Sequence, residues 1–181
     1  QVFSNHSLLQ WNTFHLDAKA KVFAEYDDID ELRSLLRQYS NLPMLHIGRG
    51  SNLLFTADFP GIVLHSRICF IKTLSCTDKQ VILQVGSGVV FDDMIAHGVA
   101  KGAAMEITTL QERIFSREEC RYGYRDSIFK NELKGQYIIT SFEFCLSPQP
   151  VLSLDYGNLK EALSAISKPT IADVRNAVTN I

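Results

Sequence analysis

An α+β fold is predicted by three features of this 181-residue sequence. Segments with the period of a strand and segments with the period of a helix follow one another without a repeating order. Several predicted strands are joined by short, hairpin-like links, which favours α+β over a doubly wound parallel sheet. The chain is also 46% hydrophobic, which is typical of a packed core and excludes a disordered tail.

The first 66 residues are predicted to alternate between strands and one helix. Alternating apolar residues over 19–26 predict a half-buried strand. Asp28 and Glu31 have the spacing of a capping box, and an apolar stripe at helical intervals follows them. The expected elements are a strand over 19–26, a helix from Asp28 to about residue 41, strands over 44–47 and 62–65, and a glycine-bearing turn over 48–52.

The remainder is predicted to be richer in strands and to end in helices. Ser116 and Glu119 form a second capping box, and Thr170 and Asp173 have the same spacing. The expected elements are strands over 69–74 and 80–85 joined as a hairpin, a turn over 86–88, a helix over 91–102 that ends at Gly102, strands over 106–110 and 136–146, and helices over 159–166 and from 170 onward.

Charge and cysteine usage exclude several classes of protein. The 18 Lys and Arg are balanced by 20 Asp and Glu, which excludes a generally basic nucleic-acid binder. No apolar run approaches the roughly 20 residues that a membrane-spanning helix needs, and the first residues do not have the pattern of a signal peptide. The four cysteines form no C-x-x-C pair, so we expect no metal site, and we expect reduced, partly buried thiols in a cytoplasmic protein.

The turn over residues 48–52 is the first candidate site. Its two glycines allow the backbone to approach a ligand closely, and successive N–H groups in such a turn can bind a phosphate. It lacks the third glycine of the dinucleotide fingerprint and the Gly-Lys-Ser/Thr of a P-loop. Taken alone, the pattern is also that of a tight strand-to-strand turn. His46 and His65 lie inside predicted strands, where packing and hydrogen bonding are commoner than ligand binding.

The turn and its neighbours resemble one enzyme family along nearly the whole chain. The matching segments are Asn-Thr-Phe at 12–14, PMLHIGRGSNLLF at 43–55, Phe-Pro-Gly-Ile-Val at 59–63, Val-Gly-Ser-Gly at 85–88, CRYGYRDSIFK at 120–130 and Leu-Asp-Tyr-Gly-Asn-Leu at 154–159. In this order they resemble the UDP-N-acetylenolpyruvoylglucosamine reductases. The run at 120–130 is highly specific to that family, whereas the glycine turn by itself is not.

The resemblance implies a flavoenzyme of peptidoglycan precursor synthesis. Such an enzyme takes a hydride from NADPH onto FAD and passes it to UDP-N-acetylglucosamine enolpyruvate, forming UDP-N-acetylmuramate. The implied fold is the FAD-binding type of vanillyl-alcohol oxidase, with two α+β subdomains. We therefore expect a first FAD-binding subdomain over 1–66, a second over 67–148, and connector helices over 149–181 that lead to a third, substrate-binding domain. Oligomeric state does not follow from the resemblance.

Several residues take roles from this resemblance. The turn formed by Gly48, Arg49, Gly50, Ser51 and Asn52, with Leu53 after it, matches the segment that holds the FAD pyrophosphate. Arg125 matches the arginine that contacts the substrate carboxylate and stabilises an enolate-like intermediate. Hydride addition builds negative charge beside that carboxylate, and a guanidinium can stabilise this charge while donating to both carboxylate oxygens in a forked contact. Tyr124 borders the same pocket in this interpretation, and Tyr156 matches a tyrosine that touches the substrate diphosphate.

Alternatives for these residues remain open on the sequence alone. Arg125 could form a structural ion pair with its neighbour Asp126, and Tyr156 could pack within its loop. Arg49 could pair with a phosphate or face solvent. The non-enzymatic alternative for the whole chain is a flavin- or nucleotide-binding module that has lost catalysis.

The sequence departs from the family pattern in two places. The glycine-rich, flavin-wrapping stretch that the family carries after residue 102 has no counterpart before Glu106. The motifs and the domain that the family carries beyond residue 181, with the serine proposed as general acid, also have no counterpart. We therefore expect an incomplete and inactive chain. Three explanations for the missing parts stay open: segments that are absent from the sequence and closed up in its numbering, a deletion, and a natural homologue that binds without catalysis.

Overall fold

The structure is a computed structural model that describes residues 1–51, 53–89, 99–123, 126–147, 151–152, 154–155 and 157–180. The chain divides into two compact units, Gln1–Leu146 and Ser147–Ile181. The first unit holds two sheets and the helices that pack on them, while the second unit holds two helices. Strands and helices mix without a βαβ repeat, so the predicted α+β class is confirmed.

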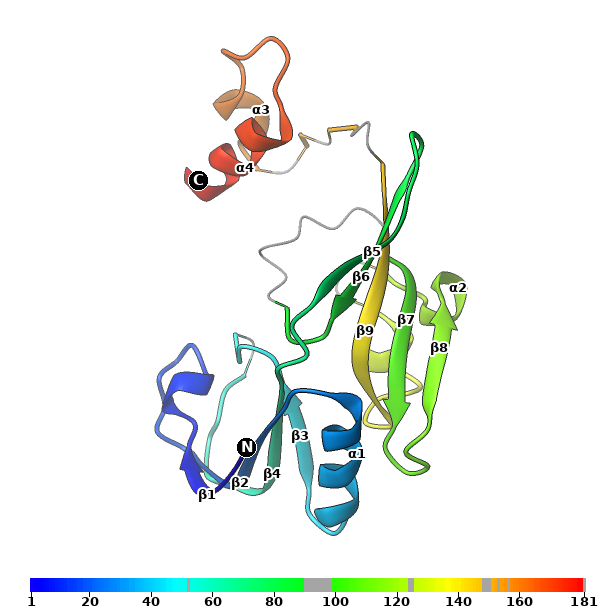
Figure 1. The fold of residues 1–181 in the computed structure, drawn as a ribbon. Helices are drawn as coiled ribbons and strands as arrows, with labels where there is room; N and C mark the ends of the chain where they lie inside the picture. The colour runs from blue at the N-terminus through cyan, green and yellow to red at the C-terminus, as the bar shows by residue number, and fades with distance from the viewer. Residues whose placement is uncertain are drawn as a thin grey trace. The chain divides into compact units, whose positions relative to one another are not determined.

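The first sheet is mixed and has four strands (Figure 1). Strand β1 is antiparallel to β2, while β4 lies between β2 and β3 and is parallel to both. The strands in sheet order are β1 (Val2–Ser7), β2 (Lys19–Tyr26), β4 (Phe59–Ser66) and β3 (Met44–Ile47). Because three strands are parallel, their carboxyl ends meet at one edge, which is where ligands bind in many α/β sheets.

Each face of this sheet is covered by a different segment. Helix α1 (Ile29–Gln38) begins at Asp28, whose side chain accepts a hydrogen bond from the Glu31 amide, as the sequence predicts. Its buried leucines pack against Tyr26 and other residues of one face. The opposite face is covered by the segment around η1 (Leu9–Trp11), which the sequence does not predict.

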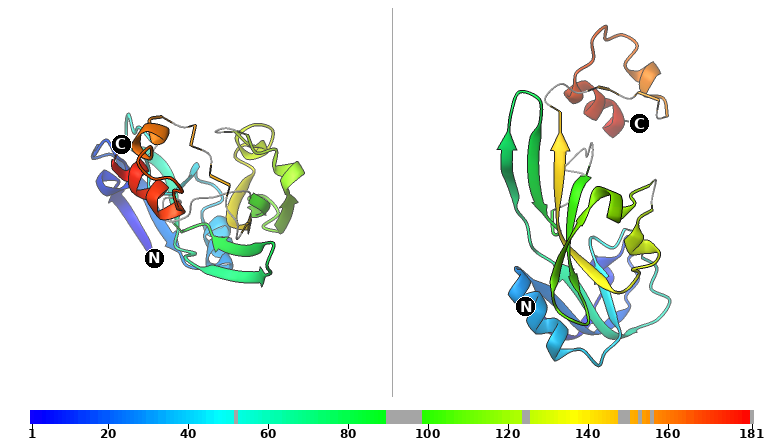
Figure 2. Two further views of the ribbon diagram at one scale, coloured as in Figure 1. Left: turned by 90° about the horizontal axis from the view of Figure 1, so that it is seen from above. Right: turned by 90° about the vertical axis from the view of Figure 1, so that its right-hand side faces the viewer.

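The second sheet has five antiparallel strands, and the right-hand view of Figure 2 shows its β5–β6 hairpin beside β9. Helix α2 and the short η3 pack around the buried ring of Phe115. The strands in sheet order are β5 (Ile71–Cys76), β6 (Val81–Gly86), β9 (Tyr137–Leu146), β7 (Val99–Glu106) and β8 (Glu112–Ser116), with α2 at Arg117–Cys120 and η3 at Ile128–Lys130.

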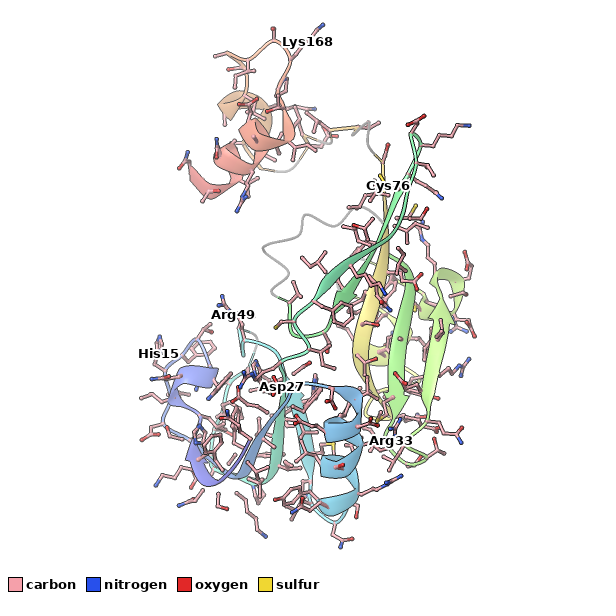
Figure 3. The ribbon with its side chains drawn as sticks, viewed as in Figure 1. His15, Asp27, Arg33, Arg49, Cys76 and Lys168 are labelled. Carbon is pink, nitrogen blue, oxygen red and sulfur yellow. The ribbon has the colours of Figure 1, made fainter. Side chains whose placement is uncertain are left out.

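The two sheets share one core cluster. Met105 and Ile138 of the second sheet are buried with the leucines of α1. The Arg33 side chain extends from α1, and its Nε donates to the carbonyl oxygen of Leu110 at 3.3 Å (Figure 3). The sheets lie on either side of residue 66 in sequence but belong to one compact unit. The division into subdomains 1–66 and 67–148 stays a prediction.

Two sequence predictions in the second sheet are wrong. Residues 91–98 of the predicted helix over 91–102 lie outside the described residues, but Val99–Glu106 is strand β7 and not a helix end. The backbone of β7 pairs with both β8 and β9, and this two-sided pairing overrides the local helical period. The strand predicted over 106–110 is also wrong beyond Glu106. There the chain turns, and the amide of Leu110 donates to the carbonyl oxygen of Glu106 at 2.9 Å.

The second unit holds α3 (Leu159–Ala162) and α4 (Ile171–Asn180). Helix α3 is shorter than the predicted 159–166, and no side-chain hydrogen bond caps its start at Asn158. Helix α4 begins as predicted, because Thr170 and Asp173 exchange hydrogen bonds in a capping arrangement.

The described part of the chain was searched for membrane-spanning helices, metal-binding groups and disulfides. None of its helices combines the length and the apolar character needed to cross a membrane. No group of three His, Cys, Asp or Glu side chains there could hold a metal ion. All four cysteines are free thiols, and the expectation of partial burial holds for Cys120 and Cys145, whereas Cys69 and Cys76 are exposed.

Candidate functional site

The glycine turn begins where β3 ends, at the carboxyl edge of the parallel strands. Gly48, Arg49 and Ser51 are exposed, while Gly50 is buried. Leu53 donates its amide to the carbonyl oxygen of Gly50 at 3.3 Å and closes the turn. Figure 3 shows Arg49 on this turn, above the strand ends. Asn52, which the sequence assigns to the same turn, lies outside the described residues.

Gly50 and Gly48 serve different purposes. Gly50 has φ +71°, and a Cβ added to it would lie 1.8 Å from the carbonyl oxygen of Trp11. No larger residue fits there, because the turn presses against the segment after η1. A Cβ added to Gly48 would meet no atom within 4 Å. Gly50 is therefore required by the fold, whereas Gly48 leaves open space beside the backbone.

The amides of this turn are available to a ligand. Among the described residues, no hydrogen bond uses the backbone N–H of Arg49, Gly50 or Ser51. Successive unpaired N–H groups in a turn are donors that suit an anion such as a phosphate. The Arg49 guanidinium adds a positive charge at the rim of the turn.

A cavity of about 360 Å³ joins this turn to a second one. The second turn follows β6 and contains Ser87 and Gly88, which the sequence analysis also singled out. Gly88 lies close to the backbone before β5, because a Cβ on it would approach the carbonyl oxygen of Ser66 to 2.8 Å. Ile139 and Phe142 of β9 line the cavity on the second-sheet side. The two turns that lie about forty residues apart in sequence therefore border one space.

Two hydrogen-bonded pairs hold the inner wall of this cavity. The Tyr26 hydroxyl and His46 Nε2 are 2.7 Å apart, and Oγ of Ser66 lies 2.7 Å from Oγ of Ser87. The second pair connects the end of β4 to the second turn. Burial raises the pKa of Tyr26 to about 12 and lowers the pKa of His46 to about 4, with the nearby His65 adding to the latter effect. Both groups are therefore uncharged at neutral pH.

An ionic group lies beside the cavity at the ends of β2 and β4. His65 Nδ1 is 3.3 Å from Oε1 of Glu25, within ion-pair distance but without hydrogen-bond geometry. Arg67 lies 3.8 Å from Glu25 and 3.2 Å from Asp27. Burial lowers the pKa of His65, while Glu25 acts in the opposite direction. The sequence predicted that both strand histidines are packed and hydrogen-bonded: His46 contacts the Tyr26 hydroxyl, and His65 packs against Trp11 and faces Glu25.

The segment at residues 120–130 is organised by Asp126. Its Oδ1 accepts hydrogen bonds from the Ser127 amide at 2.9 Å and from the Asn131 side chain at 2.8 Å. Gly123 and Asp126 exchange two backbone hydrogen bonds. Tyr124 and Arg125 lie outside the described residues, as does Tyr156 in the second unit. The catalytic role predicted for Arg125 and the substrate-binding roles predicted for Tyr124 and Tyr156 therefore stay predictions.

Sequence reasoning missed the support that other residues give to the turn. The buried Asn12 side chain bonds to the backbone of Leu8 and Leu16, and so fixes the loop against which Gly50 packs. Trp11 lies 4.5 Å from the His65 ring, measured between ring centroids. Asn12 was part of a matching motif, but nothing in its local pattern indicates which backbone groups it contacts.

No family model matches the chain, but curated relatives do. The chain is 35% identical over 212 residues to a UDP-N-acetylenolpyruvoylglucosamine reductase of Bacteroides fragilis, a match that covers 97% of the chain and 64% of the relative. It is 30% identical over 220 residues to the reductase of Flavobacterium johnsoniae, covering 100% of the chain and 65% of the relative. The chain thus spans just under two thirds of these relatives, and the aligned lengths exceed its own 181 residues.

A solved structure shares the fold. The crystal structure of UDP-N-acetylenolpyruvylglucosamine reductase (MurB) from Thermus caldophilus has a TM-score of 0.58 and 15% identity, covering 100% of the chain and 70% of that protein. At this identity the likeness concerns the fold alone, and it agrees with the α+β fold expected from the sequence. The chain is homologous to these reductases along nearly all of its length.

Proposed function

We propose that this chain, a homologue of the UDP-N-acetylenolpyruvoylglucosamine reductases, forms the FAD-binding part of such an enzyme in peptidoglycan precursor synthesis. The observation that carries the proposal is the glycine turn: Gly48, Arg49 and Ser51 line a cavity shared with a second turn, and the amides of Arg49 and Ser51 make no hydrogen bond with the described residues. Bound FAD would supply the carrier through which hydride passes from NADPH to the enolpyruvyl ether of UDP-N-acetylglucosamine.

The residues at the cavity fit the diphosphate of that cofactor. The turn offers the amides of Arg49 and Ser51, which line the cavity, and the Ser51 hydroxyl and Arg49 guanidinium add further donors. No carboxylate is among the described residues that line the cavity. A site with several donors and a positive charge therefore favours an anion over a neutral ligand. Asn52 and Leu53 complete the proposed pyrophosphate segment.

The substrate end of the proposed enzyme depends on three further residues. We assign Arg125 to the substrate carboxylate, where a forked guanidinium contact would stabilise the negative charge that develops as hydride is added. Tyr124 is assigned to the same pocket, and Tyr156 to the substrate diphosphate. These roles are proposed from the resemblance of the segments at 120–130 and 154–159 to motifs of that enzyme family. We further propose that the chain alone binds FAD weakly, does not turn over substrate, and works in the cytoplasm.

A comparison of FAD binding by the wild-type and Gly48→Ala chains tests whether the turn over residues 48–52 binds the phosphates. The added methyl group meets no protein atom, so the free energy of unfolding should change by less than about 0.5 kcal/mol. The methyl group does occupy the space assigned to the phosphates, so FAD affinity, measured by quenching of flavin fluorescence, should fall about tenfold.

Gly50→Ala is the matched comparison in the same turn. Its Cβ would collide with the Trp11 carbonyl and its backbone is left-handed, so it should lose about 2 kcal/mol of stability or more as well as FAD affinity. A wild-type chain that binds no FAD would contradict the proposed function. A Gly48→Ala chain that binds FAD as tightly as wild type would contradict the assignment of the turn over residues 48–52 to the FAD phosphates.

A further inference from the structure

His65 lines the same cavity as the glycine turn but belongs to strand β4. Its side chain is 19% exposed, so the ring lies mostly inside the protein. Nδ1 is completely buried, lies 3.3 Å from Oε1 of Glu25, and has no hydrogen-bond partner among the described residues. The indole of Trp11 packs against the ring and restricts its position. A buried imidazole nitrogen this close to a carboxylate is placed to donate to it once the ring is protonated.

The charges around His65 do not balance while the ring is neutral. Glu25 on β2 faces it, and Arg67 after β4 pairs with both Glu25 and Asp27. Within this group, two carboxylates and one guanidinium leave a net negative charge of one. Of the other charged or titratable side chains that line the cavity, His46 on β3 is uncharged at neutral pH and Arg49 on the glycine turn carries a positive charge. A proton on His65 would neutralise this group.

Nε2 is the nitrogen that a ligand could use. It makes no hydrogen bond with any residue that the structure describes, and the ring lines the cavity. With Nδ1–H directed at Glu25, an imidazolium would have Nε2–H left to donate. A carboxylate behind an imidazole fixes the ring's orientation and supports its charged form.

We propose that His65 is an anion-binding residue of the cavity that takes up a proton from solvent when a phosphate-bearing ligand binds. Glu25 is its positioning residue, and Nε2–H donates to a phosphate oxygen. This rests on the proposed function, because it assumes that the cavity holds the diphosphate of FAD. It goes beyond that function by adding a side-chain ligand from a strand and by making the affinity depend on pH.

The proton uptake follows from the balance of two effects. In the free protein, burial lowers the pKa of His65, so the ring is neutral near pH 7. An anion at Nε2 stabilises the charged form and raises that pKa again. By linkage, a group that gains a proton on binding makes the ligand bind more tightly as the pH falls.

Titration calorimetry with inorganic pyrophosphate, and separately with FAD, tests the proposal on the whole chain. Measurements at pH 7 in buffers of different ionisation enthalpy give the protons bound per ligand. Wild type should take up protons with both ligands, and His65→Gln should take up none and bind each about tenfold more weakly. Glu25→Gln should also reduce the uptake.

His15→Asn is the matched control, because it removes an exposed imidazole that does not line the cavity, and it should retain the proton uptake of wild type. His46→Gln tests the other imidazole of the cavity. Equal uptake in wild type and His65→Gln would overturn the inference while leaving the proposed function intact. Loss of uptake in His46→Gln but not in His65→Gln would also overturn it, and assign the proton to His46. A wild-type chain that binds neither ligand would overturn both proposals. Far-ultraviolet circular dichroism of each variant confirms that it is folded.

Discussion

Single residues at the carboxyl edge of the first sheet set the chemistry of the candidate site. His46 is held neutral because its ring is largely removed from water, and the nearby His65 adds to the effect. Position 50 requires glycine, because a Cβ added there would lie 1.8 Å from a backbone carbonyl oxygen. The sequence indicated a glycine turn here, but only the packing distinguishes the glycine that the fold requires from the one that leaves room for a ligand.

The lowered pKa of His46 predicts that acid destabilises the protein. The folded-state pKa of about 4 lies below the ordinary 6.5, so the unfolded chain binds more protons between these values. Stability from the neutral ring is therefore present above about pH 6.5 and is lost as the pH falls toward 4, on the order of 1–3 kcal/mol. Urea unfolding of wild type and His46→Leu at several pH values measures this, and the variant should show the shallower dependence.

His15→Asn is the control for that series. His15 is exposed and has a left-handed backbone that asparagine tolerates, so its pH dependence should follow wild type. Identical pH dependence in wild type and His46→Leu would show that His46 is not the group responsible.

Helices and strands differ in how far local sequence predicts them. Helix α1 follows its prediction because its cap, its first turn and its apolar stripe are all local features. Strand β7 does not, because its partners β8 and β9 come later in the chain and no local period encodes them. Its neighbour β8 and the first strand, β1, were not predicted either, and each is held by pairing with another strand, β7 and β2 respectively.

Removing the cap of α1 should cost a measurable amount of stability. Asp28→Ala deletes the hydrogen bond to the Glu31 amide and leaves that donor unpaired, so the free energy of unfolding should fall by about 1 kcal/mol. Asp30→Ala in the same turn removes only an exposed ion pair with Arg33, and should cost less than about 0.5 kcal/mol. Chemical denaturation of both variants makes the comparison. Equal losses would mean that charge at the helix start, and not the cap, is the stabilising feature.

At the scale of the whole molecule, the chain comprises two compact units, Gln1–Leu146 and Ser147–Ile181. Both sheets and the cavity lie in the first unit. Its shared core includes Met105 and Ile138 of the second sheet together with the leucines of α1. We therefore expect the two sheets to unfold together and the second unit to contribute little to that transition.

Truncation tests this expectation with the only tryptophan, Trp11, as the probe. A chain that ends at Leu146 should unfold in urea with the same midpoint as the whole chain. A chain that ends at Gln136 lacks β9, which pairs with both β6 and β7, so it should lose most of its stability. A clearly lower midpoint for the chain ending at Leu146 would show that the second unit stabilises the first.

The sequence by itself determined the α+β class, the capped helices, the β5–β6 hairpin and the two glycine turns. These are local patterns of period, capping and turn chemistry, and they are read within about ten residues. It also indicated, through the run at 120–130, the family to which the relatives belong.

Only the tertiary structure brought the turn after β3 beside the turn after β6, and placed His65 between Glu25 and the cavity. Those contacts join residues far apart in the chain. They depend on which strands pair and on which faces are buried, and neither is encoded in a local period.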